Sequence, residues 1–89
     1  MENFEIRFKE SVARDLRPLP NTDIERILKR INKLQKEPRP TGCEKLSTQE
    51  RYRVRQGNYR IIYEIDDENH IIIVYKVGHR REVYKSFSF

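Results

Sequence analysis

The pattern of apolar and polar residues divides the chain into strand-like and helix-like stretches. Residues 4–8 alternate between apolar and charged side chains, which predicts a short first strand with one buried face. Residues 51–56 and 59–65 show the same two-residue period. Residues 71–77 are apolar at nearly every position, which indicates a central strand covered on both faces.

Two helices are expected between the first strand and the later ones. Residues 9–16 carry an apolar stripe at helical spacing, and two prolines then prevent the helix from continuing. Thr22 and Glu25 have the spacing of a capping box, and isoleucines and leucines follow at intervals of three and four. This second helix is expected to end near Glu37, because Pro38 comes next.

The remaining stretches are turn and loop. Residues 38–50 contain prolines, a glycine and a serine, which is typical of a loop, and residues 66–69 form a polar turn. The resulting order is β-α-α-β-β-β. It predicts an α+β fold, with a mostly antiparallel four-stranded sheet and a helical hairpin packed on one face. Residues 1–89 are long enough for a single domain with one core.

A hairpin in the second half of the chain gathers positive charge. Gly57 and Asn58 are a two-residue turn signal, because such turns need positive φ at their central positions. If these two residues form the tip, Arg55 lies opposite Arg60, and Arg53 falls on the same face. Three neighbouring arginines repel one another. A polyanion is the simplest ligand that would make such a face useful.

Composition narrows the choice of partner. The formal net charge is +5 and the pI is about 9.6, which favours nucleic acid, an acidic protein or an anionic membrane. No apolar run approaches the roughly 20 residues that cross a bilayer, and no signal peptide opens the chain. Cys43 is the one cysteine, which excludes an internal disulfide and a cysteine-rich zinc site. We therefore expect a cytoplasmic protein without a metal, a cofactor or a membrane partner.

Two sequence motifs point to a known family. The segments YRVRQGNYRIIYEI and VGHRREVY, together with the order of the elements, resemble the RelE/ParE toxin superfamily, and the RelE branch is the closer match. This resemblance implies the RelE-like fold and the toxin of a type II toxin–antitoxin system. It also implies a metal-independent endoribonuclease that cuts messenger RNA in the ribosomal A site, by attack of a 2′-hydroxyl on the adjacent phosphate. The implied partners are a cognate antitoxin, the ribosome and the message.

The resemblance also implies a set of site residues. The basic residues and the tyrosine that act on RNA in RelE-type toxins fall at Arg53, Arg55, Arg60, Arg80 and Tyr84. Members of this branch often carry lysines at the first two of these positions, and arginine cannot serve as a base in their place. The general base is therefore unassigned: His79, Glu82 or ribosomal RNA could serve, and Arg81 is a supporting candidate.

Simpler interpretations compete with each of these assignments. Alternating arginines are often a solvated strand face, Tyr84 could pack on the core, and His79 could be a surface residue. Two other functions are compatible with the fold. One is a ParE-like toxin that is not a nuclease and inhibits DNA gyrase. The other is a non-catalytic RNA-binding module. The sequence shows no pattern for a recognition helix or a glycine-rich loop, which weakens this second alternative.

Overall fold

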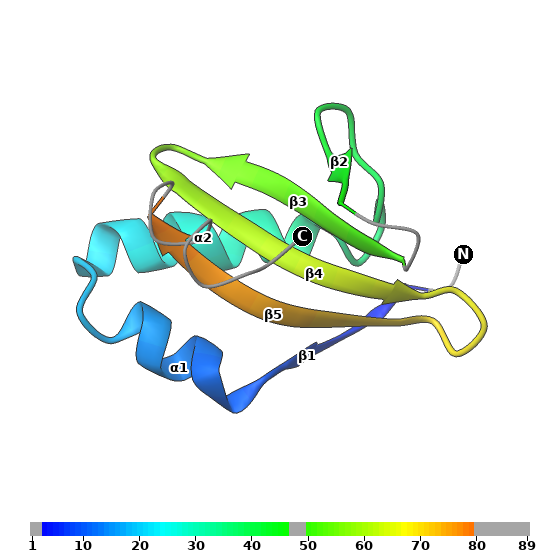
Figure 1. Cartoon of the computed structure of the whole chain (residues 1–89), viewed down its shortest axis with the longest axis horizontal. Helices are drawn as coiled ribbons and strands as arrows, with labels where there is room; N and C mark the ends of the chain where they lie inside the picture. The colour runs from blue at the N-terminus through cyan, green and yellow to red at the C-terminus, as the bar shows by residue number, and fades with distance from the viewer. Residues whose placement is uncertain (1–2, 47–49, 80–89) are drawn as a thin grey trace.

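A computed structural model of the chain describes residues 3–46 and 50–79. In chain order the elements are β1 (Glu5–Phe8), α1 (Glu10–Leu16), α2 (Asn21–Lys33), β2 (Glu44–Lys45), β3 (Arg51–Gln56), β4 (Tyr59–Asp66) and β5 (Ile71–His79). The strands form one sheet in the order β1-β5-β4-β3-β2 (Figure 1). β1 runs parallel to β5, and the other neighbouring pairs are antiparallel.

The predicted α+β fold is confirmed, with one more strand than expected. The sheet has five strands because β2 lies inside the segment 38–50, which the sequence indicated as loop. β2 pairs Glu44 with Arg53 and Lys45 with Tyr52. Two residues are too few to show a period in the sequence, so only the contact with β3 identifies this strand.

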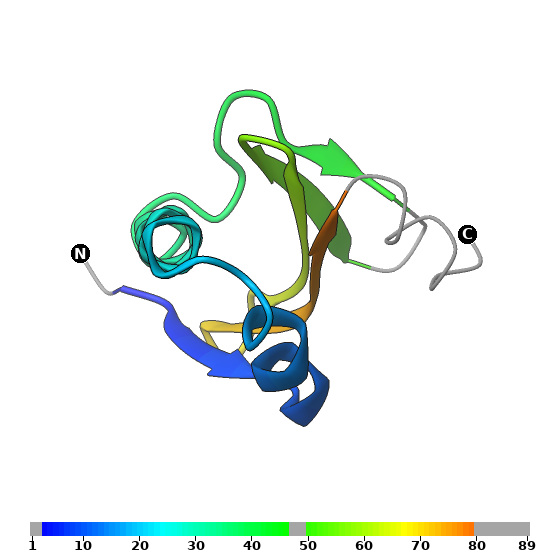
Figure 2. The ribbon, with the colours of Figure 1, turned by 90° about the vertical axis from the view of Figure 1, so that its left-hand side faces the viewer.

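Both helices pack on the same face of the sheet. Figure 2 shows α2 lying across that face and α1 lying near its lower edge. One apolar cluster joins the two layers, as the helical-hairpin prediction requires. Its buried members are Val12, Ile27, Ile31, Leu34, Tyr52, Val54, Ile61, Tyr63, Ile65, Ile72, Val74 and Val77. The core therefore fills the helix side of the sheet and leaves the arginines on the other side.

The edge of β5 is covered in two ways. β1 pairs only with its first half, from Ile71 to Val74. Beyond that point Asp15 of α1 takes over. Its carboxylate accepts a hydrogen bond from the backbone N–H of Val77 at 3.1 Å and one from Lys76 Nζ at 2.9 Å. A helix side chain thus satisfies a strand donor that would otherwise be left without a partner.

β5 is central, as predicted, but it is not covered on both faces. Ile72 and Val74 are buried, whereas Ile73 and Tyr75 are only partly buried. The register shifts beside Tyr63, so that Tyr75 is an extra residue without a direct partner in β4. Such a bulge bends the strand and turns the local side chains.

The predicted ends of α2 are wrong. The helix begins at Asn21 after Pro20, which occupies the cap position without a side-chain hydrogen bond, so Thr22 is not the cap. The carbonyl of Pro20 accepts the first helical bonds instead. At the other end, α2 stops at Lys33 rather than near Glu37, and the chain continues in tight turns. One of these turns presents the carbonyl of Gln35 to the backbone N–H of Phe4, 2.8 Å away.

Candidate functional site

The arginines of the β3–β4 hairpin lie on the sheet face opposite the helices. Arg55 pairs with Arg60, and Arg53 pairs with Ile62, which confirms the register predicted from the sequence. Arg51 follows the same alternation along β3. We call Arg51, Arg53, Arg55 and Arg60 together the arginine face.

The hairpin turns at Gly57 and Asn58 as predicted, but only one of them has the expected backbone. Gly57 has a φ of 60°, in the region that favours glycine. Asn58 does not have positive φ. The tight turn therefore depends on Gly57, and it keeps Arg55 and Arg60 opposite one another at the hairpin end.

The arginine face is not the open surface that the sequence suggested. Arg53 is 7% exposed and Arg60 is 3% exposed. Ile62, which shares this face between them, is fully buried. Arg55 is the accessible member of the hairpin set, with 60% of its side chain exposed. Two guanidinium groups are thus held within the structure, where a charge–charge contact is stronger than in water.

A carboxylate from β2 is part of the arginine face. Glu44 forms a short ion pair with Arg53, and its other oxygen lies 3.8 Å from Arg55 Nη2. The β2–β3 register explains this, because Glu44 stands directly opposite Arg53. Glu44 is about half exposed. Sequence reasoning missed it, since nothing in the segment 38–50 distinguishes it from a loop residue.

Arg51 extends the face toward β5 and α1. Its Nε lies 3.4 Å from a carboxylate oxygen of Glu64, and its guanidinium lies 4.5 Å from the centre of the Tyr75 ring. Lys9 Nζ lies 5.1 Å from the same ring. Cations at these distances are attracted to the aromatic quadrupole. The ring of Tyr75 therefore contacts two basic side chains, Lys9 and Arg51.

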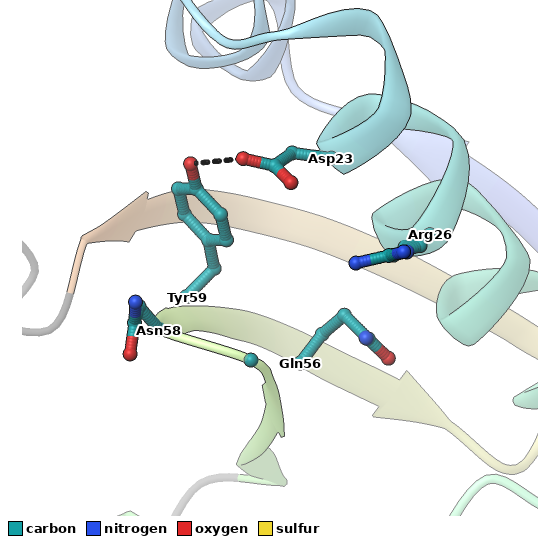
Figure 3. A pocket seen from close by; sticks show the side chains of 6 residues that line it. Asp23, Arg26, Gln56, Asn58 and Tyr59 are labelled. Carbon is teal, nitrogen blue, oxygen red and sulfur yellow. Dashed lines mark hydrogen bonds between the residues drawn. The ribbon is translucent and has the colours of Figure 1, made fainter.

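His79 does not lie with the arginines. It pairs with Tyr59, whereas Arg60 pairs with Gly78, and neighbouring residues of a strand point to opposite faces. The rings of His79 and Tyr59 meet edge to face, with centroids 5.7 Å apart. Tyr59 in turn donates a hydrogen bond to Asp23 at 2.8 Å (Figure 3). The candidate base thus belongs to a cluster on the helix side of the sheet.

The other candidates from the resemblance are Arg80, Arg81, Glu82 and Tyr84, and they lie outside the described residues. The described part of β5 ends at His79, one residue after Gly78, the partner of Arg60. Of the sequence-predicted site residues, the structure therefore brings together Arg53, Arg55 and Arg60.

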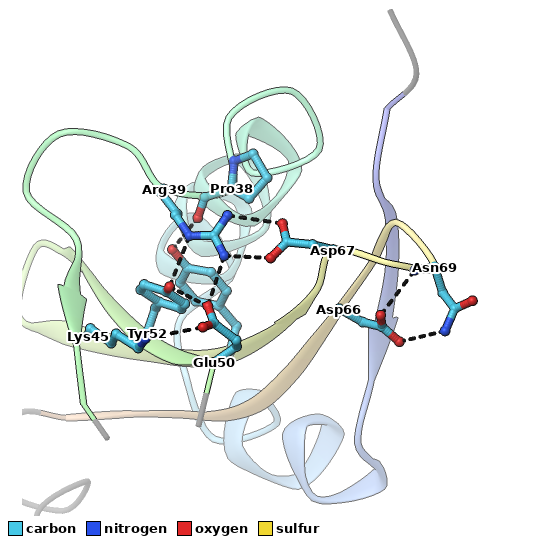
Figure 4. Close-up of polar contacts among 9 residues, drawn as sticks. Pro38, Arg39, Lys45, Glu50, Tyr52, Asp66, Asp67 and Asn69 are labelled. Carbon is cyan, nitrogen blue, oxygen red and sulfur yellow. Dashed lines mark hydrogen bonds and ion pairs between the residues drawn. The ribbon is translucent and has the colours of Figure 1, made fainter. Parts of the chain in front are cut away.

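A second polar cluster ties the far end of the sheet together. The guanidinium of Arg39 donates to both carboxylate oxygens of Asp67 at 2.7 and 3.1 Å, and to Glu50 at 2.9 Å (Figure 4). Its Nε donates to the hydroxyl of Tyr52, which donates to Glu50 at 2.6 Å. The loop after α2, the start of β3 and the β4–β5 turn are held by this Arg39 cluster.

The Arg39 cluster shifts the pKa values of its carboxyl groups. Hydrogen bonds from Tyr52 and then from Arg39 lower the pKa of Glu50 from 4.5 to about 2. The hydrogen bonds from Arg39 also lower the pKa of Asp67. A carboxyl group with a depressed folded-state pKa stabilises the fold above its unfolded pKa, and this contribution is lost as the pH falls.

Acid should therefore weaken the fold through this cluster. Between about pH 4.5 and pH 2, where Glu50 gains its proton, we expect the wild type to lose more thermal stability than the double variant Glu50→Gln/Asp67→Asn. The melting temperature followed by circular dichroism across this range is the measurement. Glu68→Gln, in the same β4–β5 turn as Asp67, is the matched control, and its melting temperature should depend on pH as that of the wild type does. If the melting temperatures of the wild type and the double variant fell equally between these pH values, the Arg39 cluster would not be the source of the acid sensitivity.

Within residues 3–46 and 50–79, no group of His, Cys, Asp and Glu side chains is arranged to hold a metal ion. In the same part of the chain, none of the helices is long and apolar enough to span a membrane.

Solved structures define the class of protein. The toxin–antitoxin complex RelBE2 from Mycobacterium tuberculosis has a chain that is 28% identical, with a TM-score of 0.76, covering 88% of this chain and 99% of that one. The isolated RelE toxin of E. coli is 25% identical, also with a TM-score of 0.76, covering 93% of each chain. The fold is thus that of the RelE toxins.

Sequence comparison assigns the family. The model described as ParE toxin of type II toxin–antitoxin system, parDE, matches residues 6–84. The toxin RelG of Mycobacterium tuberculosis is 30% identical over 87 residues, which is 92% of this chain and 97% of that protein. The chain therefore belongs to the RelE/ParE superfamily of type II toxin–antitoxin toxins.

Proposed function

We propose that this protein is a ribosome-dependent endoribonuclease, the toxin of a type II toxin–antitoxin pair. The observation that carries the proposal is the arginine face, where Arg53, Arg55 and Arg60 converge on one side of the hairpin. The relatives named RelE and RelG support it as members of the same superfamily. The substrate is messenger RNA in the ribosomal A site, and the reaction needs no metal ion.

The proposed chemistry uses the arginines to bind negative charge. Attack of a ribose 2′-oxygen on the adjacent phosphorus forms the new P–O bond and expels the 5′-oxygen, leaving a cyclic phosphate. Charge builds up on the non-bridging oxygens, and fixed guanidinium groups stabilise it through paired hydrogen bonds. Arg60 and Arg80 take this role in the proposal. Arg53 and Arg55 orient the RNA backbone and strengthen the local positive field.

Tyr84 is proposed to stack under a base or to protonate the leaving 5′-oxygen. The base that removes the 2′-proton is a separate question. The place of His79 beside Tyr59, on the helix side of the sheet, argues against His79. This leaves Glu82 and the RNA of the ribosome as the candidates, with Arg81 in a supporting role.

In this proposal Glu44 occupies the place of a substrate phosphate. It pairs with Arg53 and Arg55, the two side chains that would contact the RNA backbone. A phosphate that enters the arginine face must displace this carboxylate or share its donors. Glu44 therefore acts as an internal competitor of the substrate.

Removal of this competitor should strengthen RNA binding. For Glu44→Gln we expect tighter binding of a labelled oligoribonucleotide. The slope of the logarithm of the binding constant against the logarithm of the salt concentration should also be steeper by about 0.7, which corresponds to one more phosphate contact. Fluorescence anisotropy at several salt concentrations measures both. Glu25→Gln, at an exposed position of α2, changes the net charge equally and is the control. Equal affinities for the two variants would show that Glu44 does not compete with phosphate.

A protein antitoxin is the proposed partner. Relatives with the same fold have been solved as toxin–antitoxin complexes, among them the RelE–RelB complex of Pyrococcus horikoshii. A segment with carboxylates over Arg55 would neutralise the exposed part of the arginine face.

The second candidate function is inhibition of DNA gyrase without RNA cleavage. It is favoured by the family model, whose description names the ParE toxin. The arginine face argues against gyrase inhibition as the function, because a toxin that is not a nuclease would not require such a surface.

One experiment separates the two functions. After brief expression of the chain, primer extension on translated messages should reveal cuts in register with codons. Intact messages together with gyrase-linked DNA breaks would overturn the ribonuclease proposal and support the ParE-like function.

A further inference from the structure

A pocket lies at the hairpin end, on the sheet face opposite the arginines. It has a volume of about 180 Å³ and is lined by Asp23, Arg26, Gln56, Gly57, Asn58 and Tyr59. Figure 3 shows that α2 supplies one wall and the β3–β4 hairpin the other. The two elements are 36 residues apart at the Tyr59–Asp23 hydrogen bond. The fold therefore builds this pocket from distant parts of the sequence.

The polar side chains around this pocket are available to a ligand. In the described part of the chain, Arg26, Gln56 and Asn58 make no side-chain hydrogen bond or ion pair. Asp23 uses its Oδ2 for Tyr59. The pocket thus offers a guanidinium, two amides and a carboxylate oxygen, a mixed set of donors and acceptors.

The ring of Tyr59 is a fixed aromatic surface at this site. Its hydroxyl donates a hydrogen bond to Asp23, and this hydrogen bond raises the pKa of Tyr59. Its ring is supported by the edge-to-face contact with His79 at 5.7 Å. A second pocket of about 350 Å³ lies against Tyr59 from the α1 side. The ring is therefore held at two points while part of its surface remains accessible.

We propose that the hairpin-end pocket binds one nucleobase of an RNA strand. Aromatic stacking combined with hydrogen bonds to a base edge is the usual way in which proteins read unpaired RNA. The pocket is smaller than the roughly 300–1,000 Å³ typical of sites for drug-sized ligands, so it suits a single base. Asp23 would repel a phosphate at this position, whereas its carboxylate accepts a hydrogen bond from an exocyclic amino group. Cytosine and adenine are therefore preferred over uracil.

This inference rests on the proposed function, because it gives the substrate RNA a second contact. Gln56 and Tyr59 form the last pair of the hairpin, and each is next in sequence to a member of the arginine face, Arg55 and Arg60. An RNA strand that rounds the hairpin end has phosphate ligands on one face and a base pocket on the other. The base in the pocket then contributes to the choice of the cleaved sequence.

Nuclear magnetic resonance of the labelled full chain tests the proposal. We expect saturable shifts of the Gln56 and Asn58 side-chain amides with cytidine 5′-monophosphate, and at least fivefold weaker binding of uridine 5′-monophosphate. Ribose 5-phosphate should leave these amides unshifted. Arg26→Ala should weaken cytidine monophosphate binding at least fivefold. Arg17→Ala, which removes an exposed arginine outside the pocket, should not.

The outcomes separate this inference from the proposed function. Shifts confined to the arginine face, shifts of equal size with ribose 5-phosphate, or equal binding by the Arg26 and Arg17 variants would overturn the base pocket. A partner protein that protects Gln56 and Asn58 in a chain that binds no nucleotide would also overturn it. If the wild type binds cytidine monophosphate as expected but leaves translated messages intact, the ribonuclease proposal fails and the pocket stands.

Discussion

Arg60→Ala is expected to lower the turnover number for cleavage of translated message by about 10²–10³-fold, the usual effect of removing one fixed donor from a developing oxyanion. Arg60 stands opposite Arg55 in the hairpin and is only 3% exposed. A guanidinium held in this way needs little reorganisation when charge appears on the phosphate. Arg60→Lys keeps the positive charge but loses the planar pair of donors, so its activity should be intermediate.

The burial of Arg60 makes a folding control necessary. An exposed arginine could be truncated without cost, but Arg60 is enclosed, and alanine leaves unfilled space beside Ile62. Each variant should therefore be compared at a temperature where circular dichroism shows it folded. Arg7→Ala, on the outer strand β1, removes an exposed arginine and should cleave as the wild type does. If folded Arg60→Ala and Arg7→Ala cleaved translated message equally well, Arg60 would not be a catalytic residue.

The hairpin could be predicted from the sequence because its information is local. The alternation of arginines with apolar residues determines which face each side chain takes, and Gly57 determines where the chain turns. Together these two signals place Arg53, Arg55 and Arg60 on one face without any knowledge of the rest of the fold. The apolar period of α2 is local information of the same kind, and its buried residues Ile27 and Ile31 face the core.

The surroundings of the arginines could not be predicted, since they depend on contacts between distant segments. Glu44 belongs to a two-residue strand that is identified by its pairing with β3 and not by any period in the sequence. The side of the sheet on which His79 lies follows from its pairing with Tyr59. This register could not be predicted from the sequence, because the irregularity in β5 shifts the pairing by one residue. Burial of Arg53 and Arg60 likewise depends on tertiary packing rather than on strand periodicity.

The ribosome should make the difference between binding RNA and cutting it. The net charge of +5 favours electrostatic attraction to the RNA backbone, which does not depend on the base sequence, and salt should weaken this part of the binding steeply. Cleavage also requires the 2′-oxygen to be held in line with the scissile phosphorus, and positioning of this kind is worth about 7–11 kcal/mol of a reaction barrier. Among the described residues, Arg55 is the accessible member of the hairpin arginines. One exposed guanidinium can contact the RNA backbone, but it does not by itself hold the 2′-oxygen of a flexible strand in line with the phosphorus.

We therefore expect efficient cleavage of translated message and negligible cleavage of the same RNA when it is free. The two rates should be measured at equal concentrations of protein and RNA, in a purified translation system with and without ribosomes. Tyr84→Phe and Tyr84→Ala divide the role proposed for Tyr84, because phenylalanine keeps stacking but cannot transfer a proton. If Tyr84→Phe cleaves translated message and Tyr84→Ala does not, Tyr84 acts by stacking. If neither variant cleaves, Tyr84 acts by proton transfer. Rapid cutting of free RNA by the wild type would contradict the ribosome-dependent mechanism, since the chain would then have to carry a complete acid–base pair of its own.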